Sequence, residues 1–186
     1  MVAGKHTLVA RLAAAGLAAV FSINVEAGNQ EERKPSSAVG RDTWPGVRIP
    51  DPVAQRTSRQ ALDRARELLA KPQCRSVLTQ FADREGHALA DRLDALAVDA
   101  QTYLSMIVFY DGTRHRSCVT GVIAFTTPGS RMVHLCLDEL KRTWQQKPTH
   151  VVAAFIHEVL HTLGLGENPP SPHEITRRVL QQCSEE

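Results

Sequence analysis

The sequence predicts an α+β domain, because helical and strand-like patterns occupy separate stretches of the chain. Residues 51–71 repeat apolar side chains at helical spacing, and residues 102–137 are rich in β-branched and aromatic residues between turn signals. Residues 150–163 are apolar on nearly every face, which is typical of a buried helix. At 186 residues the chain is long enough for one domain with a single core.

The first 27 residues have the pattern of a secretory signal. Positive charge at Lys5 and Arg11 precedes an apolar run at 12–21, and small residues end the segment at Ala27. Because this run is shorter than the roughly 20 residues of a membrane span, we predict cleavage after Ala27, with an uncleaved anchor as the alternative. The protein is therefore expected to be exported, either to the periplasm or outside the cell.

Residues 28–52 are polar and rich in proline and glycine, which predicts a linker or disordered lead-in to a domain spanning 53–186. Asp51 can cap a first helix that begins at Pro52 and stops before Pro72. Two shorter helical patterns follow, at residues 74–81 and 89–97.

Three strands are expected next. Residues 102–110 end in the turn pair Asp111-Gly112, and the runs 118–125 and 131–137 flank a second turn at 126–130. We predict a small antiparallel meander from these runs. The strand at 131–137 could bind an extended peptide along its edge.

The helix expected at 150–163 carries three titratable groups that its burial makes costly. His157 and His161 are four residues apart and so lie on one face, with Glu158 beside them. In this spacing, H-E-x-x-H, the two imidazoles can bind one zinc ion and the carboxylate can handle the proton of a bound water. Gly164 is expected to end the helix and turn the chain back, so that a third ligand can come from just beyond it.

The stretch HEVLHTLGLGE at 157–167 resembles the long zinc motif of metzincin-type peptidases, H-E-x-x-H-x-x-G-x-x-H, with Glu167 in place of the last histidine. More widely, residues 157–176 are similar to exported bacterial zinc metallopeptidases. The resemblance implies a zincin-like fold and a Zn²⁺ ion bound by His157, His161 and Glu167. It further implies that Glu158 is the general base in the hydrolysis of a peptide or protein substrate.

The sequence departs from the metzincin pattern in two ways: no methionine and no tyrosine follows the motif. A zinc-binding but catalytically inactive secreted module is therefore the alternative function, and a metal-free domain is a third. Glu174 competes with Glu167 as third ligand, although the run Ser171 to Glu174 also reads as a capping box that opens a short C-terminal helix. His173 is a further candidate for a general acid.

Four cysteines in an exported chain predict disulfides. We favour Cys118 with Cys136 and Cys74 with Cys183, one of three possible connectivities. The formal net charge of +2 argues against a nucleic-acid surface, which needs clustered lysine and arginine. No membrane partner is expected beyond the signal segment.

Overall fold

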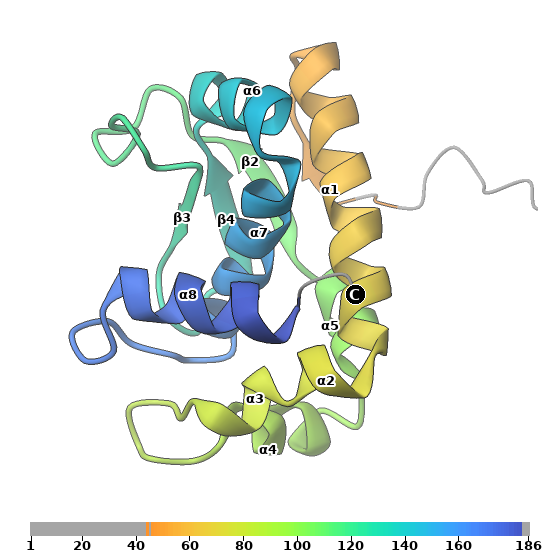
Figure 1. The fold of residues 1–186 in the computed structure, drawn as a ribbon, viewed down its shortest axis with the longest axis vertical. Helices are drawn as coiled ribbons and strands as arrows, with labels where there is room; N and C mark the ends of the chain where they lie inside the picture. The colour runs from red at the N-terminus through yellow and green to blue at the C-terminus, as the bar shows by residue number, and fades with distance from the viewer. Residues whose placement is uncertain (1–43, 45, 184–186) are drawn as a thin grey trace, which may run out of the picture. The chain divides into compact units, whose positions relative to one another are not determined.

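The computed structural model describes residue 44 and residues 46–183. The predicted signal peptide and most of the predicted lead-in lie outside these residues. The described chain is α+β, with a small mixed sheet and helices packed beside it (Figure 1). Its elements are β1 (Val47–Arg48), α1 (Pro52–Ala70), α2 (Pro72–Arg75), α3 (Val77–Gln80), α4 (Leu89–Ala95), α5 (Ala100–Ser105), β2 (Val108–Asp111), β3 (Ala124–Thr126), β4 (Met132–Leu135), α6 (Leu137–Gln146), α7 (Pro148–Thr162) and α8 (Pro172–Gln182).

Helix α1 begins and ends where the sequence predicts. The Asp51 carboxylate accepts hydrogen bonds from the backbone N–H groups of Val53 and Ala54, which an N-terminal helical turn leaves unpaired. The helix stops at Ala70, two residues before Pro72. Its apolar face is buried in the core: Ala54, Ala61, Leu62, Ala65, Leu68 and Leu69.

The predicted lead-in is wrong at its C-terminal end, because the chain is already part of the fold before Asp51. Trp44, Val47 and Ile49 are buried. The indole N–H of Trp44 donates to Asp63 on α1 over 2.7 Å, and β1 pairs with β2. These apolar residues are separated by proline, glycine and arginine, so they form no periodic pattern that could have been recognised.

The first predicted strand is also partly wrong, because residues 102–105 belong to α5. The Asp99 side chain accepts the backbone N–H of Thr102 and so caps this short helix. Tyr103 and Leu104 are buried, and the Tyr103 hydroxyl donates to the carbonyl of Thr162 at the end of α7. Packing of this face onto the core outweighs the β-propensity of the run.

The sheet is mixed rather than an antiparallel meander. The strand order is β1-β2-β4-β3, in which β1 and β4 run parallel to β2, and only β3 is antiparallel. Asp111-Gly112 makes no tight hairpin, because Gly112 continues the ladder by donating to Leu135. Residues 112–123 then carry the chain past β4, so that β3 becomes an edge strand and β4 an inner one.

Helix α6 is missing from the sequence prediction, although Leu137, Leu140 and Trp144 have helical spacing. Leu137 and Leu140 are buried, and Trp144 packs partly buried against the core.

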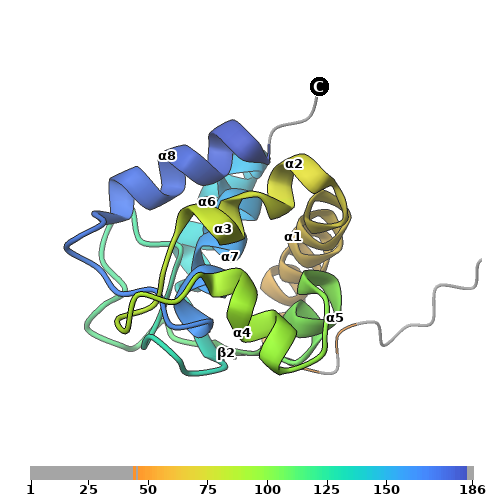
Figure 2. The ribbon, with the colours of Figure 1, turned by 90° about the horizontal axis from the view of Figure 1, so that it is seen from below.

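Helix α7 is the central element and is buried as predicted. It packs against α1, α6, α8 and β3, and the view from below shows the surrounding helices (Figure 2). Phe155 of α7 stacks on Phe109 of β2, with ring centroids 5.6 Å apart. The motif is therefore carried by a helix that packs against three other helices and a strand, which limits its freedom to move.

Both favoured disulfides are present: Cys74–Cys183 joins α2 to the end of α8, and Cys118–Cys136 joins the loop before β3 to the start of α6. Two disulfides are compatible with an exported protein. Within the described residues, none of the helices has the length and apolar character that crossing a bilayer requires.

Candidate metal centre

Two histidines of α7 direct their rings at the same point. The Nε2 atoms of His157 and His161 are 2.9 Å apart, because side chains four residues apart in a helix lie one above the other. Both side chains are buried. Two imidazoles in this arrangement leave one nitrogen each for a shared ion.

The end of α7 brings a third group to these rings. Gly164 has a φ of +114°, and its N–H donates to the carbonyl of His161 while the N–H of Leu165 reaches Leu160. This pair of bonds is a Schellman motif, which reverses the chain at the helix end. A carboxylate oxygen of Glu167 consequently lies 3.1 Å from Nε2 of His161 and 3.9 Å from Nε2 of His157.

The other nitrogen of each ring is also held. Nδ1 of His157 lies 2.9 Å from the hydroxyl of Thr176 on α8, and Nδ1 of His161 lies 2.7 Å from the carbonyl oxygen of Leu165. Such partners fix the orientation of a metal-binding imidazole and select its tautomer. The sequence alone assigns no role to Thr176, because nothing in its local pattern distinguishes it from the other polar residues of α8.

Burial shifts the protonation of two groups in α7. Burial raises the pKa of Glu158 to about 8, and the nearby Glu167 carboxylate adds to this shift. Burial lowers the pKa of His157 to about 3, and His161 contributes in the same direction. His157 is therefore a neutral imidazole at physiological pH, the form that binds metals.

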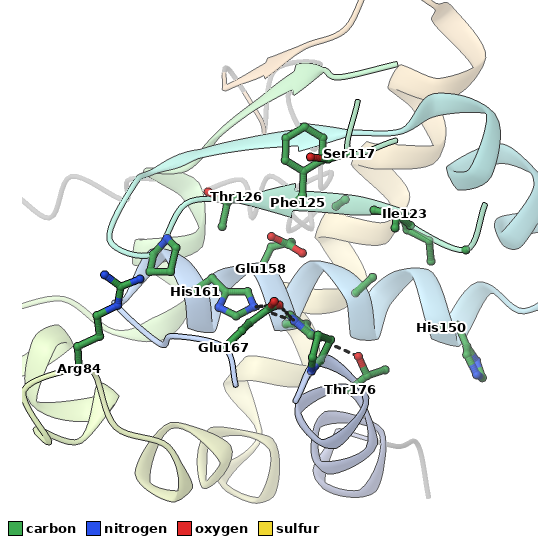
Figure 3. Close-up of a pocket in the computed structure, with 17 residues that line it drawn as sticks. Arg84, Ser117, Ile123, Phe125, Thr126, His150, Glu158, His161, Glu167 and Thr176 are labelled. Atoms are coloured by element: carbon green, nitrogen blue, oxygen red, sulfur yellow. Dashed lines mark hydrogen bonds and ion pairs between the residues drawn. The ribbon is translucent and has the colours of Figure 1, made fainter. Parts of the chain in front are cut away.

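Glu158 lies next to the histidines but is not one of the converging group. Its side chain points toward β3 (Figure 3), and its buried Oε2 atom has no hydrogen-bond partner among the described residues. Burying a carboxyl oxygen without a hydrogen-bond partner is costly, so packing alone does not explain the position of Glu158.

The two remaining candidates lie elsewhere. The Glu174 carboxylate accepts a hydrogen bond from Arg178 over 2.6 Å, and its backbone N–H is capped by Ser171. Among the described residues only the Ser171 half of the predicted capping box forms, because the Glu174 carboxylate pairs with Arg178. Glu174 is not in the group that converges on one point. His173 is exposed and lines a separate hollow of about 380 Å³ along α8, together with Arg177.

A cleft of about 640 Å³ opens over the histidines, with β3 as one wall (Figure 3). The expectation that the strand at 131–137 forms the edge is wrong, because β4 is paired on both sides. Cys136 donates to Ile123, and Phe125 pairs with His134 in the same register. The backbone groups of Ala124 and Thr126 between these pairs must therefore face the open edge.

His157, His161 and Glu167 offer ligand atoms that all lie within 4.8 Å of one another, so this group could hold a metal ion. The ion would lie in the cleft, between the carboxyl group of Glu158 and the open edge of β3. We compared the chain with protein-family models, with curated proteins and with solved structures, and found no match.

Proposed function

We propose that this chain is an exported zinc-dependent peptidase that binds Zn²⁺ through His157, His161 and Glu167. The observation that carries the proposal is the meeting of three ligand atoms from α7 and its return loop, directly beside the buried carboxyl group of Glu158. Two imidazoles, one carboxylate and an open side are typical of catalytic zinc sites.

The distances support zinc as the ion. A tetrahedral site with bonds of about 2.0–2.1 Å to nitrogen and oxygen places neighbouring ligand atoms about 3.3–3.4 Å apart. The three separations between His157, His161 and Glu167 are 2.9, 3.1 and 3.9 Å and bracket that value. The nitrogen-rich ligand set also favours zinc over calcium or magnesium, which prefer oxygen ligands.

The residues of the cleft would have different roles in catalysis. When bound, zinc supplies a Lewis acid that polarises the substrate carbonyl and acidifies water. Burial favours the protonated form of Glu158, and a cation bound beside it would favour the ionised form. As a carboxylate, Glu158 would accept the proton of the attacking water and return it to the leaving amine. Backbone groups of Ala124 and Thr126 at the β3 edge hold the peptide extended by strand addition.

The decisive experiment compares Glu158→Gln with the unchanged chain. Metal analysis of the purified proteins is expected to give one zinc per chain for both, because Glu158 is not a ligand. Cleavage of an unfolded protein substrate is expected to fall at least about 100-fold in the variant, the usual contribution of a general base. Glu67→Gln, an exposed carboxylate on α1, is the matched control and should cleave normally. Equal cleavage by both forms would refute the mechanism.

The metal site has its own test. His161→Ala is expected to lose zinc, whereas His173→Ala, which changes a histidine outside the group, should keep it. Zinc retained in full by His161→Ala would remove the proposed ligand set, whatever the activity.

A second candidate is a zinc-binding secreted module without catalytic activity. Neither tyrosine of the chain lines the cleft: Tyr103 donates to the Thr162 carbonyl, and the ring of Tyr110 lies tilted beside His134, with ring centroids 6.1 Å apart. Neither tyrosine is therefore placed to donate a hydrogen bond to the developing oxyanion. This candidate predicts one zinc per chain and no cleavage by any form.

A further inference from the structure

One end of the cleft carries a positive charge that the proposed mechanism does not use. Arg84 lines the cleft beyond Thr126, and His150 lies at the opposite end (Figure 3). The Arg84 side chain is exposed. Within the described part of the chain no carboxylate lies within 4.0 Å of its guanidinium group, so its hydrogen-bonding capacity is available to a ligand.

The loop that presents Arg84 is internally braced. Asp83 accepts the backbone N–H groups of Glu85 and His87 through its side chain, and its own N–H donates to the carbonyl of His87. The two ends of the loop are joined by a bridge between Ala82 and Ala88. The arginine is thus attached to a defined backbone and loses only side-chain freedom on binding.

This loop packs directly on the segment that delivers Glu167. A Cβ atom at Gly164 would come within 3.2 Å of the Asp83 Cβ, and one at Gly166 would lie 3.6 Å from the Arg84 Nε. The guanidinium group is therefore one residue away from the proposed ligand Glu167, whose carboxylate is turned toward the two imidazoles.

From this placement we infer that Arg84 determines specificity by binding a carboxylate of the peptide substrate, at the Thr126 end of the cleft. The inference rests on the proposed peptidase function. A planar guanidinium group can bind a carboxylate through two parallel hydrogen bonds. An arginine that lines a cleft and has no carboxylate partner is suited to this kind of binding. The acidic side chains that line the cleft, Glu158 and Glu167, lie at the proposed metal centre. A carboxylate of the bound substrate would therefore balance the charge of Arg84.

The direction in which the peptide binds along β3 distinguishes two sources of the carboxylate. A peptide that adds antiparallel to β3 has its N-terminal half at the Thr126 end, so the group would be an Asp or Glu side chain before the cleaved bond. A peptide that adds parallel to β3 would bring its free C-terminal carboxylate there instead.

The test measures binding first, so that it does not depend on turnover. Zinc-loaded Glu158→Gln protein is titrated with dye-labelled peptides in which a single Glu is moved along a neutral frame, with free or amidated C-termini. We expect one carboxylate position to bind about tenfold or more tightly than its Gln or amide counterpart, the usual effect of a charge-assisted pair. Adding Arg84→Gln should abolish that preference, and Arg84→Lys should restore part of it.

Arg56→Gln is the matched control, because it removes one positive charge from an exposed position on α1 outside the cleft. The inference is overturned if no carboxylate position is preferred, or if the preference survives Arg84→Gln or is lost equally with Arg56→Gln. Cleavage assays with active protein separate the two proposals. Cleavage that does not depend on substrate carboxylates refutes only the role of Arg84, whereas carboxylate-selective binding without any cleavage refutes the peptidase.

Discussion

At the level of single residues, the two histidines differ in what holds their outer nitrogens. His161 lies against a backbone carbonyl, whereas His157 depends on the Thr176 side chain. Thr176→Val removes that hydroxyl at nearly constant volume. We expect zinc affinity to fall about 10- to 100-fold, the usual effect of losing such a partner, measured by competition with a chelator.

Thr79→Val is the control for this change. Thr79 lies on α3 away from the cleft, and its hydroxyl donates only to the carbonyl of Ser76, the residue before the helix. Zinc affinity should therefore stay constant. An unchanged affinity in Thr176→Val would mean that the hydrogen bond does not orient His157.

The third ligand can be assigned by a pair of conservative changes. Glu167→Gln replaces a carboxylate 3.1 Å from His161 and is expected to lower zinc affinity strongly, because the neutral amide is a poor ligand. Glu174→Gln alters a group that pairs with Arg178 and should leave the affinity within about twofold, since surface pairs contribute little. Isothermal titration with zinc compares them, and the reverse order would make Glu174 the ligand.

How far the sequence predicts this site depends on the kind of residue. The histidines and Glu158 follow from helical spacing, and Glu167 from a glycine stop and a resemblance. Thr176 and Arg84 come from α8 and from the loop before α4, and their approach depends on tertiary packing. No local pattern could have indicated either residue.

Among the elements, the C-terminal turn of α7 controls where Glu167 lies. Gly164→Ala would force a side chain into a left-handed conformation and place its Cβ against Asp83. We expect the free energy of unfolding to fall by at least about 1–2 kcal/mol, and zinc affinity to fall with it. Urea denaturation of the zinc-free protein measures the first effect separately from the second.

Gly86→Ala provides the comparison, because Gly86 also has a positive φ but no atom within 4 Å of a new Cβ. This variant should lose stability from backbone strain and retain zinc affinity. Equal zinc affinity in the two variants would show that the turn does not position the ligand.

The strands show where local patterns mislead. Residues 102–105 have the composition of a strand but are helical, because Asp99 caps them and Tyr103 packs inward. The order of the strands could not be read from turns alone, since a twelve-residue connection, 112–123, carries β3 to the far side of β4. Helix α1 was predictable because it combines a cap at Asp51, a periodic apolar face and a stop before Pro72. Helix α7 was predictable because it is apolar on nearly every face and ends before Gly164.

At the scale of the whole molecule, burial shows why the start of the folded domain is not predicted correctly from the sequence. Trp44 is buried and lies under the guanidinium group of Arg66, yet it sits in a polar stretch whose composition suggests a linker. A single large aromatic residue can anchor a segment without any periodicity. The start of a domain is therefore harder to predict than its central helix.

The two disulfides are expected to stabilise the molecule unequally and to affect different functions. Cys74–Cys183 closes a sequence separation of 109 residues and Cys118–Cys136 one of 18, so loop-closure entropy predicts contributions of roughly 5 and roughly 3 kcal/mol. Denaturation of the two double serine variants, both zinc-free, tests this order. Equal losses, or a larger loss for the shorter loop, would contradict the entropic argument.

The same two variants should also differ from each other in zinc binding and in peptide binding. The first disulfide anchors α8, which carries Thr176, so its loss should weaken zinc binding. The second ties down the loop that leads into β3, so its loss should raise KM for a cleaved peptide while zinc affinity stays constant. If both variants bind zinc as the unchanged chain does, then the packing of α7 alone holds His157 in place, and α8 is not needed to orient it.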